Sequence, residues 1–216
     1  MKALVAEAIG TFVLVLGGCG AIAVGSLGAG LGQAGVAAAF GLAIMVGVYA
    51  LGHVSGAHFN PAVTLAFALT RHFPPRRVLP YWVAQIGGAI AAALFLRATL
   101  GATANLGVTH PAVALAPAFL WEAAFTALLM LVIMAVATDT RAVGEAAAIA
   151  IGGTIALASL VAGPVSGASL NPARSLGPAL VAGDLSDIWL YLLAPPLGAA
   201  AGALTYAWLR GAAARR

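Results

Sequence analysis

One stretch of this chain occurs twice, and the two copies constrain the fold more than any other feature. Residues 52–69 read GHVSGAHFNPAVTLAFAL, and residues 163–180 read GPVSGASLNPARSLGPAL. Identity at this many positions of a single offset indicates an internal duplication. At an offset of 111 positions, the residues that recur unchanged are Gly52, Val54, Ser55, Gly56, Ala57, Asn60, Pro61, Ala62, Leu65, Ala68 and Leu69.

Each copy has a glycine-rich run, then Asn-Pro, then a short apolar segment. An asparagine cap followed by proline at the first helical position is a signal for the start of a helix. The apolar segments are shorter than the roughly 20 residues that a helix needs to cross a bilayer. We therefore predict two half-helices. Their caps and first turns are Asn60, Pro61, Ala62, Asn171, Pro172 and Ala173.

The composition predicts an integral membrane protein. Of the 216 residues, 62% are hydrophobic and 7% are charged, and the mean hydropathy is +1.05. A soluble domain of this size could not cover such a surface with polar groups. In a soluble protein the net charge of +4 would suggest nucleic acid as a partner. Here the orientation of loops explains it better, and we expect no nucleic-acid partner.

Long apolar segments predict six spans. They cover residues 3–24, 33–51, 78–99, 117–137, 145–162 and 188–209. The first is expected to be a retained span and not a signal peptide, because Glu7 lies within it and a later helix needs it as a partner. The lone cysteine, Cys19, is expected to pack in the core.

The duplication extends to the spans. Glu7-x-x-x-Thr11 opens the first span, and Glu122-x-x-x-Thr126 opens the fourth. Each half therefore holds three spans and one half-helix, and an odd number of spans inverts the second half relative to the first. We predict a single all-α channel domain over residues 1–216, with inverted-topology repeats at about 1–105 and 112–216, six transmembrane helices and two re-entrant half-helices.

Charge predicts the orientation. Eight of the ten Lys and Arg residues fall on the side of the two termini. Cytoplasmic loops carry an excess of such residues, so we expect cytoplasmic termini and a location in the plasma (inner) membrane. The eight residues are Lys2, Arg71, Arg76, Arg77, Arg141, Arg210, Arg215 and Arg216.

Two inverted half-helices would bring their N-terminal ends together near the membrane midplane. Those ends carry partial positive charge and repel cations and protons. Asn60 and Asn171 would add amide donors there, although one such copy alone could merely cap a helix. A lane of carbonyl acceptors with central donors suits small neutral hydroxylated solutes. The expected acceptors are the carbonyls of Gly56, Ala57, His58, Phe59, Gly167, Ala168, Ser169 and Leu170.

These motifs resemble a known family over nearly the whole chain. The boxes HFNPAV and LNPARS, with Glu-x-x-x-Thr in the first and fourth spans, resemble the aquaporins, or major intrinsic proteins. The segments GPVSGASLNPARSLGPALV and DTRAVGEAAAIAIGGT look most similar to nodulin-like intrinsic proteins and their bacterial relatives. The resemblance implies a homotetramer in the lipid bilayer, with one pore in each protomer and no cofactor.

The resemblance also implies a four-residue constriction. Counting from the Asn-Pro-Ala boxes places it at Phe40, Ser159, Ala168 and Arg174. A buried guanidinium is costly unless it lies at an aqueous pore. The alternative for Arg174 is a structural ion pair with a glutamate of the first or fourth span.

The constriction departs from two patterns in the family. Strict water channels carry a histidine where this chain has Ser159, and classical glycerol facilitators carry an aspartate where it has Ser175 and aromatic residues at two filter positions. We therefore expect a wider pore for water and small uncharged solutes such as glycerol, boric acid and arsenous acid. The alternative is a water-selective aquaporin.

The remaining polar and aromatic residues are expected to support this arrangement. Glu7 and Glu122 should accept hydrogen bonds from loop N–H groups and brace the loops, and the His58 side chain could bond such a glutamate. The other histidines, His53, His72 and His110, lie at or near interfaces with no expected role, and no pair forms a metal site. The expected interface anchors are Tyr81, Trp82, Trp121, Trp189 and Tyr191.

Other classes fit less well. A secondary transporter needs ionisable groups at the midplane to couple a gradient, and the candidates here have other expected roles. A cation channel would need an acidic ring. A structural junction protein could share this fold, and transport assays would separate it. An enzyme is not expected, because no nucleophile–base pair, metal cluster or phosphate-binding loop is present.

Overall fold

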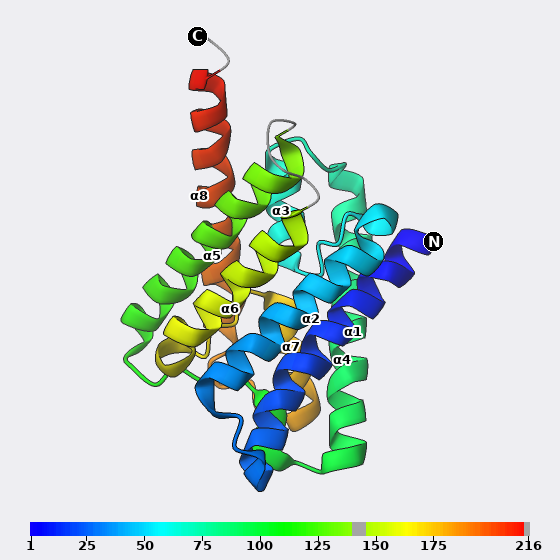
Figure 1. The fold of residues 1–216 in the computed structure, drawn as a ribbon, viewed down its shortest axis with the longest axis vertical. Coiled ribbons are helices and arrows are strands. Elements are labelled where there is room, and N and C mark those ends of the chain that lie inside the picture. Colours follow the sequence, from blue (N-terminus) through cyan, green and yellow to red (C-terminus); the bar gives the residue numbers. More distant parts are fainter. Residues whose placement is uncertain (140–145, 214–216) are drawn as a thin grey trace.

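Six long helices form the frame of the protein (Figure 1). The computed structural model describes residues 1–139 and 146–213. Arg141, Arg215, Arg216 and the predicted start of the fifth span at residue 145 therefore lie outside the described residues. The six helices, each long and apolar enough to cross a membrane, are α1 (Lys2–Val24), α2 (Gly32–Ser55), α4 (Val78–Leu100), α5 (Leu115–Thr138), α6 (Ala147–Ser166) and α8 (Ile188–Ala213).

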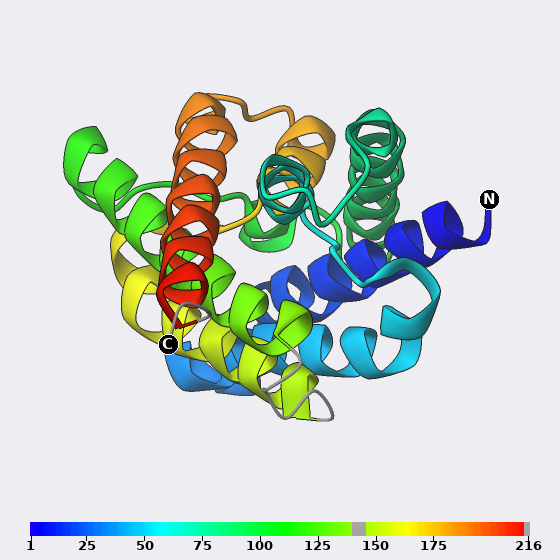
Figure 2. The same ribbon diagram turned by 90° about the horizontal axis from the view of Figure 1, so that it is seen from above.

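The two half-helices are α3 (Pro61–Leu69) and α7 (Pro172–Ala182). Each begins where the sequence predicts: the side-chain oxygens of Asn60 and Asn171 accept from the backbone N–H two residues later, at 2.9 Å in both cases. The half-helices lie one above the other in Figure 1 and overlap in the view from above in Figure 2. They are stacked along the axis of the bundle, between α4 and α8 (Figure 2).

Packing follows the duplication. Helix α1 packs on α4 as α5 packs on α8, and α2 packs on α6 across the two repeats. Each half-helix packs against the last span of the other half, α3 on α8 and α7 on α4. The two repeats are therefore interlocked. The shorter connections are η1 (Gly25–Ala29), η2 (Pro75–Arg77) and η3 (Thr103–Gly107).

Glycines allow the paired helices to touch backbone to backbone. A Cβ at Gly88 in α4 would overlap the Ala8 carbonyl of α1. A Cβ at Gly198 in α8 would overlap the Ala123 carbonyl of α5 in the same way. Close approach of this kind is how helices associate in lipid, where the hydrophobic effect does not drive them together.

The helix ends at the two repeated glycine-containing runs differ from the sequence prediction. The second span was expected to end at residue 51 and the fifth at 162, but α2 continues to Ser55 and α6 continues through Pro164 to Ser166. Glycine in the run GHVS or GPVS weakens a helix without ending it. The helices end at Gly56 and Gly167, whose φ angles of 89° and 85° require the left-handed conformation that glycine favours.

Candidate functional site

The two loops that precede the half-helices hold strained backbone. Ala57 and Phe59 have φ angles of 50° and 48°, and Ala168 and Leu170 have φ angles of 42° and 54°. A left-handed conformation costs an L-residue about 1–2 kcal/mol. Such strain persists only where surrounding contacts hold it in place.

Glu7 supplies those contacts for the first loop. Its carboxylate accepts from the backbone N–H of His58 at 3.0 Å and of Phe59 at 2.7 Å. The hydroxyl of Ser55 adds a third bond at 2.7 Å. The carboxylate is fully buried, so these donors replace the water that it has lost.

Glu122 occupies the equivalent place in the second loop. It accepts from the backbone N–H of Ser169 at 2.9 Å and of Leu170 at 2.8 Å, and from the Ser166 hydroxyl at 2.7 Å. It is also fully buried. With the loop N–H groups turned toward a glutamate, the neighbouring carbonyls are free to face the interior of the bundle.

Tyr81 and Tyr191 were expected to be interface anchors, and the structure shows that they are not. They are 1% and 0% exposed, and their hydroxyls donate to the carbonyls of Ser55 at 2.9 Å and Ser166 at 2.6 Å. A helical carbonyl normally accepts from the N–H four residues later. For Ser55 that partner is Phe59, whose N–H is bonded to a glutamate instead. The tyrosine hydroxyl therefore satisfies a carbonyl at the end of the helix.

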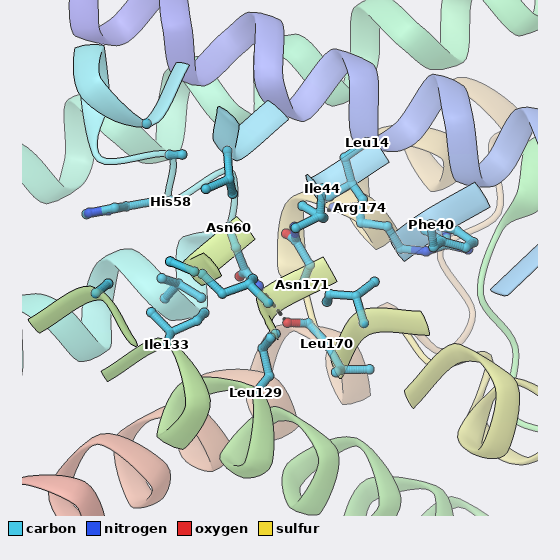
Figure 3. A pocket seen from close by; sticks show the side chains of 18 of the residues that line it. Leu14, Phe40, Ile44, His58, Asn60, Leu129, Ile133, Leu170, Asn171 and Arg174 are labelled. Atoms are coloured by element: carbon cyan, nitrogen blue, oxygen red, sulfur yellow. Dashed lines mark hydrogen bonds between the residues drawn. The ribbon is translucent and has the colours of Figure 1, made fainter. Parts of the chain in front are cut away.

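Asn60 and Asn171 join the two loops to each other (Figure 3). The side-chain amide of Asn60 donates to the carbonyl of Leu170 at 2.7 Å. The amide of Asn171 donates to the carbonyl of Phe59 at 2.8 Å. An amide NH₂ group has two hydrogens, so each asparagine keeps one donor beyond this bond. Both asparagines line the same cavity.

Two cavities meet inside the bundle. The deep cavity, about 280 Å³, contains both asparagines and is otherwise largely apolar, with Ile44, Leu129 and Ile133 in its wall. The mouth cavity, about 420 Å³, opens at the ends of α1 and α2. The residues that line both cavities are Phe40, Ser159, Ala168 and Arg174.

The loop residues expected to present carbonyls are distributed over the two cavities. Phe59 is the exception, because it lines neither cavity and its carbonyl accepts from Asn171. Its ring is packed over Gly10, where a Cβ would overlap it. Those that line the deep cavity are Gly56, Ala57, His58, Ala168, Ser169 and Leu170, while Gly167 lines the mouth cavity.

Arg174 is 2% exposed and lies at the junction of the cavities. Its Nη1 donates to the Gly107 carbonyl at 2.7 Å, and its Cζ lies 5.0 Å from the centre of the Phe40 ring. Within the described residues it forms no ion pair with either buried glutamate, so the alternative of a structural ion pair is wrong. Its Nε has no hydrogen-bond partner. This nitrogen is buried from solvent, so Arg174 borders the junction through other atoms of its side chain.

The ring of Phe40 packs against Gly18 of α1. A Cβ at Gly18 in α1 would overlap the Phe40 ring. The ring thus occupies space that only a glycine leaves open. Phe40 and Arg174 lie beside each other in Figure 3, an aromatic face against a guanidinium.

The His58 side chain bonds a different partner from the one expected. Its Nδ1 lies 3.0 Å from Thr64 Oγ1, and its backbone N–H, not its ring, bonds Glu7. Gln85, which the sequence analysis missed, donates from one amide nitrogen to Glu7 at 2.7 Å and to Thr64 at 3.0 Å. No local pattern marks Gln85, which is 78 positions from Glu7.

His110 also has partners that the sequence analysis did not foresee. Its two ring nitrogens lie 3.1 Å from Asp184 and 3.3 Å from Asp187, and the residue lines the mouth cavity. Among residues 1–139 and 146–213, no group of three His, Cys, Asp or Glu side chains could hold a metal ion.

Known proteins are similar to this chain in sequence. Residues 1–206 match the family described as Major intrinsic protein. The chain is 49% identical to "Aquaporin NIP1-1" of Oryza sativa subsp. japonica, over 97% of this chain and 75% of the rice protein. It is 50% identical to "Nodulin-26" of Glycine max, over 95% of this chain and 77% of that protein.

A solved structure shares the fold. The aquaglyceroporin from Plasmodium falciparum matches with a TM-score of 0.82 and 24% identity, covering 95% of this chain and 94% of that chain. The family match confirms the predicted resemblance, and the structural match confirms an all-helical fold with six spans. The family consists of channels and not of enzymes. The chain therefore belongs to the major intrinsic protein family, the aquaporins, and is similar to its plant NIP members.

Proposed function

We propose that this aquaporin channel conducts water and small uncharged solutes, namely glycerol and metalloid hydroxides such as boric and arsenous acid. One observation carries the proposal: Phe40, Ser159, Ala168 and Arg174 line both cavities, and two of the four have small side chains. A hydroxyl and a methyl group at such a junction leave room beside the guanidinium for a solute larger than water.

The geometry supports passage with hydrogen bonds maintained. A solute at the junction meets Arg174 and Ser159, then loop carbonyls, then the remaining amide donors of Asn60 and Asn171. Hydroxyl groups can both donate and accept, so they can replace their water contacts at each step. A cation meets the guanidinium and the positive ends of α3 and α7 instead.

A narrower function is the alternative. Arg174 lies 5.0 Å from the Phe40 ring, and a junction closed further by these two residues would select water alone. Strict selection of water would then not require a histidine at position 159.

We also propose a homotetramer in the plasma (inner) membrane with cytoplasmic termini. The excess of Lys and Arg on the side of the termini supports this orientation. Membership of the aquaporin family supports the tetramer. In the same proposal, Glu7 and Glu122 brace the loops that carry the asparagines.

Stopped-flow measurements on proteoliposomes test the solute range. Volume changes are recorded after an osmotic step in an impermeant sugar, and then in inward gradients of glycerol and boric acid. We expect both water and solute fluxes to exceed those of empty liposomes. Water flux without flux of either solute would overturn the proposal in favour of the water-selective alternative.

A matched pair of variants tests the junction itself. Ser159→His narrows the junction and should reduce the flux of glycerol and boric acid more than the flux of water. Ser159→Ala removes the hydroxyl without narrowing and should keep the solute flux. Equal losses of water and solute in Ser159→His would show that position 159 does not set the size limit.

A further inference from the structure

Gln33 lies near the start of α2, in the wall of the mouth cavity, where no sequence motif marks it. Its Nε2 donates to the backbone carbonyl of Ser159 at 2.6 Å. Gln33 precedes Phe40 by two helical turns on the same cavity wall. Its amide group therefore lies at the rim of the junction, against one of the residues that form it.

The bond to Ser159 determines which way the amide of Gln33 faces. A carbonyl oxygen can only accept, so the NH₂ group of Gln33 must face Ser159 and its Oε1 must face away. No residue within the described part of the chain donates to this Oε1. The chain thus holds an unused acceptor at a fixed place in the mouth cavity.

Gly163 keeps the space that the amide occupies. A Cβ at Gly163 would overlap Nε2 of Gln33. Gly163 lies one turn beyond Ser159 on α6 and lines the same cavity. Two helices therefore define the position of the Gln33 amide: α2 carries it and α6 receives it.

Two other polar side chains of the mouth cavity, Thr109 and His110, have partners of their own. The Thr109 hydroxyl lies 2.7 Å from the Ser175 hydroxyl, and the ring nitrogens of His110 lie beside two aspartates. Gln33 Oε1 has no partner among the described residues, and Ser159, whose hydroxyl can donate or accept, lines the same cavity. A molecule with several hydroxyls can donate to Gln33 Oε1 while it bonds the Ser159 hydroxyl.

We propose that Gln33 is a specificity-determining residue of this channel, whose Oε1 accepts a hydroxyl of a polyol as it enters the junction. This inference rests on the proposed function. At low solute concentration, permeability depends on the free energy of the solute at its highest barrier relative to the solute in water. A hydrogen bond to the channel therefore raises permeability only if it forms at that barrier, where the solute loses its water. Gln33 lies against Ser159, and its contact is made at that point. Loss of the Gln33 contact should affect water less than a polyol, because one water molecule has fewer hydrogen-bonding groups to satisfy at the junction.

Substitution of Gln33 tests this directly. In Gln33→Leu, the glycerol permeability should fall about threefold to tenfold relative to water permeability, the range expected for loss of one neutral hydrogen bond. Gly163→Ala should lower the same ratio without altering Gln33, because the added methyl displaces its amide. The double variant should lower the ratio no further than Gln33→Leu alone.

Thr154→Val is the matched control. Thr154 lies on α6, its hydroxyl donates to Ala150 within the same helix, and it lines neither cavity. The ratio of glycerol to water permeability of this variant should equal that of the wild type. Water permeability of each variant reports whether the channel has folded.

Two results would overturn the inference while the proposed function stands. One is an unchanged glycerol-to-water ratio in both Gln33→Leu and Gly163→Ala. The other is a parallel loss of water and glycerol flux, which would mean that Gln33 only ties α2 to α6. If the wild type conducts neither glycerol nor boric acid, the proposed function itself fails, and the role of Gln33 falls with it.

Discussion

The two loops before the half-helices have the same backbone and different side-chain surroundings. In both, a buried glutamate accepts two backbone N–H groups and a serine hydroxyl, a tyrosine satisfies the serine carbonyl, and an asparagine bonds the opposite loop. The left-handed residues fall at matching positions. Duplicated sequence has therefore preserved duplicated backbone geometry.

The difference lies in what surrounds that backbone. In the first loop, Gln85 adds a fourth donor to Glu7, and the His58 ring packs among the rings of Phe67, Phe73 and Tyr81 at 4.8–5.3 Å. The second loop has instead a row of hydroxyls, with Ser169 2.5 Å from Ser175 and Thr109 2.7 Å from Ser175.

The counterpart of Arg174 sharpens this contrast. At the equivalent place the first half has Val63, which is apolar and buried. The first half thus adds bracing, and the second adds the charged side chain at the junction. The backbone support is therefore common to both halves, whereas only the second half has a charged residue at this pair of equivalent positions.

Replacing either buried glutamate should reduce the stability of the protein more than the other changes, and the loss should be larger for Glu122 than for Glu7. Glu122→Gln places an NH₂ group against backbone N–H donors and leaves one of them unpaired, which should destabilise the protein by about 3 kcal/mol. Glu7→Gln should cost about 1 kcal/mol less. The Oε1 of Gln85 is buried without a partner, so a rotation of this amide can accept from the new NH₂ group.

Thermal unfolding in detergent, followed by tryptophan fluorescence, compares the two glutamate variants. When Gln85→Leu is combined with Glu7→Gln, the destabilisation should become as large as that of Glu122→Gln. Equal destabilisation by the two single variants would contradict the role given to Gln85.

The bonds between the loops should respond equally to substitution. Asn60→Asp and Asn171→Asp keep the helix cap but replace the donating NH₂ group by an oxygen that faces a carbonyl. Each should cost about 2 kcal/mol, the price of a buried acceptor left unsatisfied. Chemical denaturation measures both. A difference greater than about 1 kcal/mol between them would show that the loops are less alike in energy than in geometry.

Arg174→Val makes the second loop resemble the first. Removing the guanidinium from the junction should raise the glycerol permeability by up to about tenfold, as lowering a barrier by about 1.4 kcal/mol would do. Thr154→Val, at a residue that lines neither cavity, is the control and should leave the ratio of glycerol to water permeability unchanged. Unaltered glycerol flux in Arg174→Val would mean that this residue does not limit solute size.

The smallest effect is expected beyond the second half-helix, where Asp184 has no counterpart in the first half. Hydrogen bonds from the side chain and then the backbone of Ser186 lower the pKa of Asp184, with smaller contributions from Asn105 and His110. A lowered folded-state pKa gives stability that is present above the ordinary carboxyl pKa and is lost as pH falls through the lowered value.

Unfolding of the wild type and of Asp184→Asn at pH 6 and pH 3 measures this contribution. Because the carboxyl is exposed, the difference should be small, and it should be smaller at pH 3 than at pH 6. A difference that does not decrease between pH 6 and pH 3 would assign the effect of Asp184 to something other than its charge.

The sequence predicted the features that the chain contains twice. The Asn-Pro start of a half-helix and its asparagine cap each occur twice at the same offset. The second occurrence shows that the first is not a chance match. The glutamates were expected to meet loop N–H groups, and the structure places those groups at 2.7–3.0 Å from them. The position of the helix ends failed by four residues, because glycine and proline mark a weak helix as readily as a loop.

Contacts that occur once could not be predicted. Gln33 meets Ser159 across 126 positions, and neither residue type nor spacing indicates the pair. The tyrosines were misplaced for another reason. An aromatic residue near the end of a span is typical of an anchor, and only the geometry of the loop reveals a helical carbonyl that has lost its usual donor.

The reciprocal bonds between the loops have a consequence for how such a chain could arise. Asn60 needs the Leu170 carbonyl, and Asn171 needs the Phe59 carbonyl. A half-length chain could complete these bonds only with a second copy of itself inserted upside down, so one polypeptide would need to adopt both topologies. A single chain that holds both halves has no such requirement, and each half is free to carry its own charge pattern.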